Sequence, residues 1–125
     1  MKKVVLVVLS LVFITACAQG SGDAFITYEG KSSNWKGQLQ LSRDDSSMNG
    51  TYSFRLLNGE ITEVENFTLN INEGGTILNE EKILLDRSIE TSIQCSGCMT
   101  FNEDTIIPVV IRWNGKTETF NLKAP

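Results

Sequence analysis

Apolar and polar residues alternate along most of the chain after residue 23, and this period of two predicts half-buried β-strands. A short β-prone segment at 24–28 comes first. Turn-forming residues separate the segments, so the pattern predicts about seven or eight short strands. The clearest alternating runs are 35–41, 52–56, 67–71, 89–95 and 107–113.

An Asn-Gly pair at 114–115 predicts a tight hairpin, because both residues tolerate a positive φ. A two-residue loop there sets Val109 opposite Phe120. It also sets Ile107 opposite Leu122, so both strands present apolar residues to one core. The last part of the chain is therefore expected to be a β-hairpin with a fixed register.

A second Asn-Gly pair, Asn58–Gly59, also predicts a hairpin, but its register is poor. A two-residue loop would set Phe54 opposite Glu63 and so bring a carboxylate to the apolar face. Two alternatives remain open. Either a bulge turns Val64 inward, or residues 60–65 form an edge strand or a connection.

Two further segments have less regular patterns. Residues 43–50 are mostly polar and are expected to form a loop. Residues 77–89 fit either one helical stripe or two short strands. The polar cluster at 79–82 favours two strands with a turn between them.

Together these elements predict an all-β fold. Regular spacing of short strands and turns is typical of a small antiparallel β-sandwich, immunoglobulin-like, or of a partly open barrel. Residues 24–125 are long enough for one such domain with its own core and short enough to exclude two.

The first residues follow a different pattern. Lys2 and Lys3 precede an apolar run over 4–14. A positive start and a short apolar core are typical of a cleaved signal peptide, which we expect to be residues 1–16. The run is shorter than the roughly 20 apolar residues that a membrane-spanning helix needs.

The segment Ile14–Cys17 resembles the lipobox of bacterial lipoproteins. That resemblance implies a diacylglyceryl group on the Cys17 thiol and cleavage just before it. Two acyl chains hold a protein stably on a bilayer, whereas one holds only marginally. We therefore expect a protein anchored in the cell membrane through Cys17, on the extracytoplasmic face. Residues 17–23 would form a lipidated, flexible tether.

Charge and composition narrow the function classes. The formal net charge is −4, and loss of Lys2 and Lys3 with the leader makes it −6. An acidic domain repels phosphate backbones, so nucleic acid is not an expected partner. The chain contains no histidine, which excludes catalysis and metal binding that depend on that residue. We expect no cofactor, no metal and no catalytic residues.

The pair Cys95 and Cys98 is the only motif with reactive chemistry. In an exported protein an even pair of cysteines predicts a disulfide, and Gly97 permits the tight turn between them. The alternative is a thiol-disulfide oxidoreductase, which needs a depressed thiol pKa. Glu103 and Asp104 have the wrong charge to favour a thiolate.

The mature chain also resembles small surface lipoproteins of Gram-positive bacteria, whose function is unknown. The likeness consists of Asn34-Trp35-Lys36 and of a terminal hairpin at 111–122. It implies a β-rich module and no particular activity. We expect a non-enzymatic binding or structural module with an envelope protein or ligand as its partner. An inhibitor or immunity-type lipoprotein that uses the loop at 43–50 is a further alternative.

Overall fold

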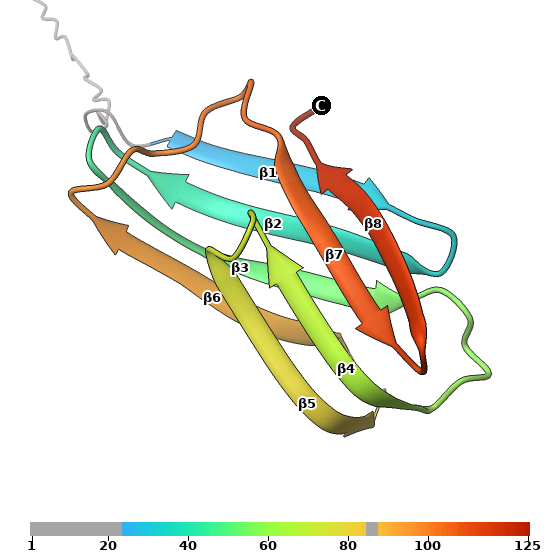
Figure 1. Ribbon diagram of the computed structural model, residues 1–125. Helices are drawn as coiled ribbons and strands as arrows, with labels where there is room; N and C mark the ends of the chain where they lie inside the picture. Colours follow the sequence, from blue (N-terminus) through green and yellow to red (C-terminus); the bar gives the residue numbers. More distant parts are fainter. Residues whose placement is uncertain (1–23, 85–87) are drawn as a thin grey trace, which may run out of the picture.

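The computed structural model describes residues 24–84 and 88–125, which form eight strands and no helix. Sheet A has the strand order β1-β2-β3-β6, sheet B has the order β5-β4-β7-β8, and all neighbours are antiparallel (Figure 1). This is a small antiparallel β-sandwich, as predicted, and not a closed barrel. The strands are β1 (Ala24–Lys31), β2 (Trp35–Arg43), β3 (Ser47–Leu56), β4 (Glu63–Ile71), β5 (Thr76–Leu84), β6 (Ile89–Ser96), β7 (Ile107–Trp113) and β8 (Lys116–Leu122).

The inward residues of the alternating runs form one core between the sheets. In β2, Trp35 and Leu39 are fully buried, while the alternating polar residues Lys36 and Gln38 face outward. The ring of Trp35 lies 5.7 Å from that of Trp113 and 5.6 Å from that of Phe67, so the indole joins the two sheets. Burial of a large apolar side chain contributes about 1.5–3 kcal/mol, and this core is what holds the sheets together.

The terminal hairpin is confirmed with its register. Val109 lies opposite Phe120, and Ile107 lies opposite Leu122. Asn114 and Gly115 have φ angles of 49° and 79°, which is the conformation that the Asn-Gly pair was expected to supply.

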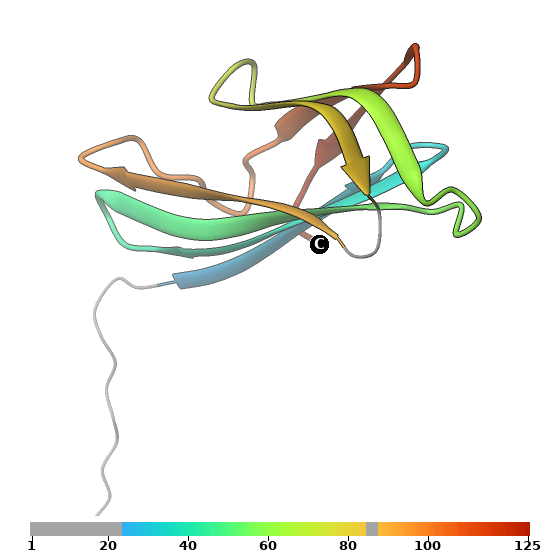
Figure 2. The ribbon, with the colours of Figure 1, turned by 90° about the horizontal axis from the view of Figure 1, so that it is seen from below.

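Strands β1 and β8 close one side of the sandwich. The backbone N–H of Glu29 donates to the carbonyl of Lys123 at 2.8 Å, and the N–H of Lys123 donates back at 3.0 Å. Gly30 makes the approach possible, because a Cβ there would overlap the carbonyl oxygen of Asn121. On the other side β5 and β6 are edge strands that no ladder joins within the described residues (Figure 2).

The hairpin expected at Asn58–Gly59 is wrong. The turn itself forms, since the Asn58 side chain accepts the N–H of Glu60 at 2.9 Å, but the chain then crosses to sheet B. The second neighbour of β3 is β6, which offers apolar Ile89 to Phe54 instead of Glu63. The better apolar partner therefore overrides the local turn signal.

The two alternatives for the next segment hold only in part. The residues before Glu63 form a connection, but residues 63–65 belong to β4, where Val64 is fully buried. The β4–β5 register contains no extra residue, so no bulge in that ladder turns Val64 inward. Phe67 also points into the core, three positions later, so the alternation breaks between them. Asn66, at a φ of 53°, supplies that break.

For residues 77–89, strands were correctly favoured over a helix, but the expected turn at 79–82 is wrong. Strand β5 runs through this polar cluster, with Asn79 paired to Thr68 and Glu80 paired to Phe67. An edge strand has solvent on one side, so it accommodates these polar side chains. The connection at 85–87 lies outside the described residues.

Candidate functional site

The sulfur atoms of Cys95 and Cys98 lie 2.01 Å apart, at disulfide distance, as the sequence predicted. Strand β6 ends at Ser96, and Gly97, at a φ of 71°, turns the chain so that the two side chains meet. Cys17, the leader 1–16 and the tether 17–23 lie outside the described residues. No helix within 24–84 or 88–125 is long and apolar enough to cross a membrane.

The cysteine loop, residues 95–98, is hydrogen-bonded to the turn that connects β2 and β3. The carbonyl oxygen of Ser46 accepts the N–H groups of Gly97 at 2.6 Å and Cys98 at 3.2 Å. Cys95 is paired with Met48 of β3, and both cysteines pack partly buried against the core. A reactive thiol needs an exposed, electropositive surrounding, and both cysteines are only partly exposed in this fixed loop.

The rest of the β6–β7 connection packs on the same end of the sandwich. The Tyr28 hydroxyl donates to the carbonyl of Asn102 at 2.7 Å, and the Tyr28 ring meets Phe101 edge-on at 6.2 Å. Burial raises the pKa of Tyr28, Arg43 partly opposes the rise, and Glu103 adds to it. The loop therefore acts as a cover for the end of the core.

The loop expected at 43–50 is wrong in its extent. Strand β2 continues to Arg43 and β3 begins at Ser47, which leaves only a three-residue turn at 44–46. Asp44 stabilises this turn, because its carboxylate accepts the N–H groups of Ser46 at 2.9 Å and of Ser47 at 2.8 Å. These bonds and one from the Ser47 hydroxyl lower the pKa of Asp44. Of the polar residues that suggested a loop, three form this turn, and only Ser47 and Asn49 lie on β3.

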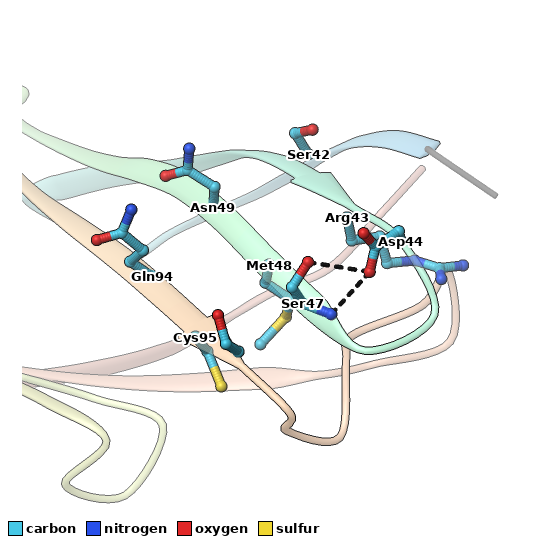
Figure 3. Close-up of a pocket in the computed structure, with 9 residues that line it drawn as sticks. Ser42, Arg43, Asp44, Ser47, Met48, Asn49, Gln94 and Cys95 are labelled. Carbon is cyan, nitrogen blue, oxygen red and sulfur yellow. Dashed lines mark hydrogen bonds between the residues drawn. The ribbon is translucent and has the colours of Figure 1, made fainter. Parts of the chain in front are cut away.

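The outer face of sheet A carries two shallow hollows that together touch all four strands, and we call the pair the outer trough. One hollow of about 190 Å³ lies beside Gln94 of β6, and one of about 380 Å³ lies beside Phe25 of β1. Ser42 and Asn49 line both hollows, so the two are neighbours. Ser42, Asn49 and Gln94 project to the same side in Figure 3, while Met48 and Cys95 point to the other.

A second polar cluster lies at the opposite end of the molecule and was missed in the sequence. Glu118 lies near the tip of the terminal hairpin and accepts four hydrogen bonds. Ser32 Oγ donates to its Oε1 at 2.5 Å, and the Asn34 backbone N–H donates to the same oxygen at 3.0 Å. Asn34 Nδ2 and Trp113 Nε1 donate to Oε2 at 2.7 and 3.0 Å. The position of Glu118 opposite inward-facing Ile111 was the one signal that could have revealed this cluster.

The electrostatics of Glu118 follow from these contacts. Burial raises the pKa of its carboxyl, but the hydrogen bonds from Ser32, Asn34 and Trp113 outweigh burial and leave the pKa below its usual value. All four donors belong to the β1–β2 connection or to β7, so the carboxylate ties the two sheets together. The polar surroundings of Glu118 are therefore explained by its structural role in joining the sheets.

The chain matches no known protein-family model, no curated protein and no solved structure. The likeness to Gram-positive surface lipoproteins therefore stays a prediction based on short motifs. Within 24–84 and 88–125, no three acidic or cysteine side chains come close enough together to hold a metal ion. The polar, partly hollowed outer face of sheet A is the candidate functional surface.

Proposed function

We propose that this protein is a lipid-anchored module on the extracytoplasmic face of a bacterial cell membrane, where it binds an envelope partner without catalysing a reaction. The observation that carries the proposal is the leader, in which a short apolar run ends at Ile14-Thr15-Ala16-Cys17. Two acyl chains on Cys17 would hold the protein on a bilayer without a membrane-spanning segment.

The geometry of the sandwich fits such an anchor. Strand β1 begins at Ala24, at the same end as the turn 44–46 and the cysteine loop, because Ala24 pairs with Arg43 and Ser47 pairs with Ser96 (Figure 1). Six residues separate Cys17 from Ala24, so the seven Cα–Cα steps between them reach at most about 25 Å. The ten residues of β3 span about 33 Å. The tether is thus shorter than the sandwich, and this end would face the membrane.

The ionisable groups with shifted pKa support binding over catalysis, since three of the four have a role in the fold and the fourth, Tyr52, is fully buried in the core. Asp44 stabilises a turn, Glu118 joins the sheets, and Tyr28 holds the end loop. Perturbed groups in a cleft would instead suggest an active site. The oxidoreductase and inhibitor functions remain alternatives, but the cysteine pair is half-buried and the segment 43–50 is mostly strand.

Detergent partitioning of the protein expressed in a bacterial host tests the anchor. We expect mature-size wild-type protein in the membrane fraction and the detergent phase. Cys17→Ala should remove this species and give uncleaved or soluble protein. The double variant Cys95→Ser/Cys98→Ser is the matched control and should partition like wild type. A mature-size Cys17→Ala protein that partitions like wild type would contradict the proposal.

A further inference from the structure

The outer trough combines one exposed aromatic ring with rows of uncharged hydrogen-bonding groups, and Arg43 and Asp44 also line its hollow beside Gln94. The register of sheet A aligns its outward side chains in rows that cross the strands. The two rows nearest the Ala24 end contain no charged residue. They are Phe25, Ser42, Asn49 and Gln94, followed by Thr27, Gln40, Thr51 and Ser92.

The polar groups of these rows are available to a ligand. The side-chain amides of Gln40, Asn49 and Gln94 make no hydrogen bond to another described residue, and all three are exposed. Each amide offers two donors and one acceptor oxygen. Adjacent strands lie about 4.8 Å apart, so the row beside Phe25 spans about 14 Å over four strands.

Phe25 is 82% exposed and lines the larger hollow together with Gln40 and Asn49. A single exposed apolar residue is ordinary on a protein surface. This one differs because its ring borders a hollow that combines apolar lining from Ile26 and Leu41 with hydroxyl and amide groups of neighbouring polar residues. Binding sites typically combine an apolar surface with a few placed polar groups.

We infer that the outer trough binds a neutral oligosaccharide, with the Phe25 ring against the apolar C–H face of one sugar and the amides bonded to sugar hydroxyls. This inference names the ligand class of the proposed envelope module and so rests on the proposed function for its location, although the binding itself does not require the anchor. Charge disfavours polyanions, because the domain is acidic, Glu29 and Glu90 border the trough in the next row, and Asp44 offsets Arg43 at the hollow beside Gln94. A protein partner would need a cluster of buried anchors, and the trough offers only Phe25.

Calorimetric titration with chitotetraose, cellotetraose and maltotetraose tests the inference. The protein is the membrane-extracted chain in detergent micelles. We expect saturable binding of at least one tetrasaccharide, in the millimolar range or tighter. Phe25→Ala should weaken it about tenfold, which corresponds to about 1.4 kcal/mol. Asn49→Ala should weaken it by a smaller factor.

Thr119→Ala is the matched control, because Thr119 is exposed on β8 in the other sheet. It should leave binding unchanged, and all three variants should keep the wild-type melting temperature. Absence of saturation with all three sugars up to about 10 mM overturns the inference. So does binding that Phe25→Ala leaves unchanged, or that Thr119→Ala weakens equally. Sugar binding by Cys17→Ala would separate a failed anchor from a failed trough.

Discussion

At the scale of single residues, two buried tyrosines of sheet A differ in one contact. Tyr28 and Tyr52 are both fully buried, on β1 and β3. The Tyr28 hydroxyl donates to Asn102, whereas the Tyr52 hydroxyl has no hydrogen-bond partner among the described residues. Burial, with a smaller effect of Tyr28, raises the pKa of Tyr52 to about 12. A buried polar group without a partner costs about 1–3 kcal/mol.

We therefore predict that Tyr52→Phe keeps or raises the free energy of unfolding at pH 7, while Tyr28→Phe lowers it by about 1 kcal/mol. Because the pKa of Tyr52 is raised in the folded state, the wild-type protein keeps its full stability below the unfolded-state pKa of about 10. It loses stability as the pH rises towards 12. The advantage of Tyr52→Phe should thus grow above pH 10. Urea unfolding against pH measures both effects, and a marked loss in Tyr52→Phe at pH 7 would contradict them.

Glu118 gives the second prediction at this scale. Glu118→Gln removes the charge and replaces one acceptor oxygen by an amide group, so Ser32, Asn34 or Trp113 loses its acceptor. The free energy of unfolding at pH 7 should fall by about 2 kcal/mol, since a hydrogen bond to a charged group contributes about 1.5–3 kcal/mol. The folded-state pKa of Glu118 is lowered, so this stability is complete above the unfolded value of about 4.3 and is lost as pH falls through the folded value.

The difference between wild type and Glu118→Gln should therefore be largest near neutral pH and shrink in acid. Glu90→Gln is a suitable control, because Glu90 is exposed on the outer face of β6. Thermal melts of the three proteins from neutral to acidic pH give the comparison. A difference that stays constant with pH would mean that the carboxylate charge contributes nothing at this site.

At the scale of elements, several contacts besides the sulfur pair hold the cysteine loop in place. The carbonyl oxygen of Ser46 accepts two N–H groups of the loop, and just beyond the loop Met48 Sδ accepts the N–H of Phe101 at 3.2 Å. Closure of so short a loop contributes only about 2 kcal/mol in the chain-entropy account. The loop should therefore keep its position when the sulfur link is removed.

The double variant Cys95→Ser/Cys98→Ser is accordingly expected to lower the free energy of unfolding by no more than about 2 kcal/mol. It should fold with an unchanged β-sheet spectrum. The oxidoreductase alternative makes a different prediction, in which wild type reduces or oxidises a disulfide substrate and the double variant does not. Insulin reduction assays with both proteins decide between them, and turnover by wild type alone would favour the enzyme.

The elements also show how far a sequence pattern can be followed. The hairpin of β7 and β8 was predictable with its register, because a turn signal and two apolar faces agree. At Asn58 the turn signal and the apolar face disagree, and the apolar face decides. Alternation predicts that a strand exists, but not which strand lies beside it, so the pairing of β3 with β6 could not be foreseen.

At the scale of the whole molecule, the two-layer architecture was predictable and the candidate site was not. The outer trough joins residues that are far apart in the sequence, from Phe25 to Gln94, and only the order of sheet A brings them into one row. In the sequence these side chains are ordinary outward positions of separate strands. The Glu118 cluster was hidden for the same reason, since its donors come from residues more than 80 positions away as well as from its own hairpin.

The orientation of the whole molecule depends on Cys17. If two acyl chains hold that residue, the Ala24 end faces the bilayer and the Glu118 cluster faces away from it. The outer face of sheet A then stands beside the membrane, where it is accessible to envelope glycans.

Mass spectrometry of the protein purified from the membrane fraction of a bacterial host is the most direct test of this anchor. The account predicts a chain that begins at Cys17 and carries a diacylglyceryl group on its sulfur. A mature chain with an unmodified Cys17, or a full-length chain that retains Met1 to Ala16, would contradict it.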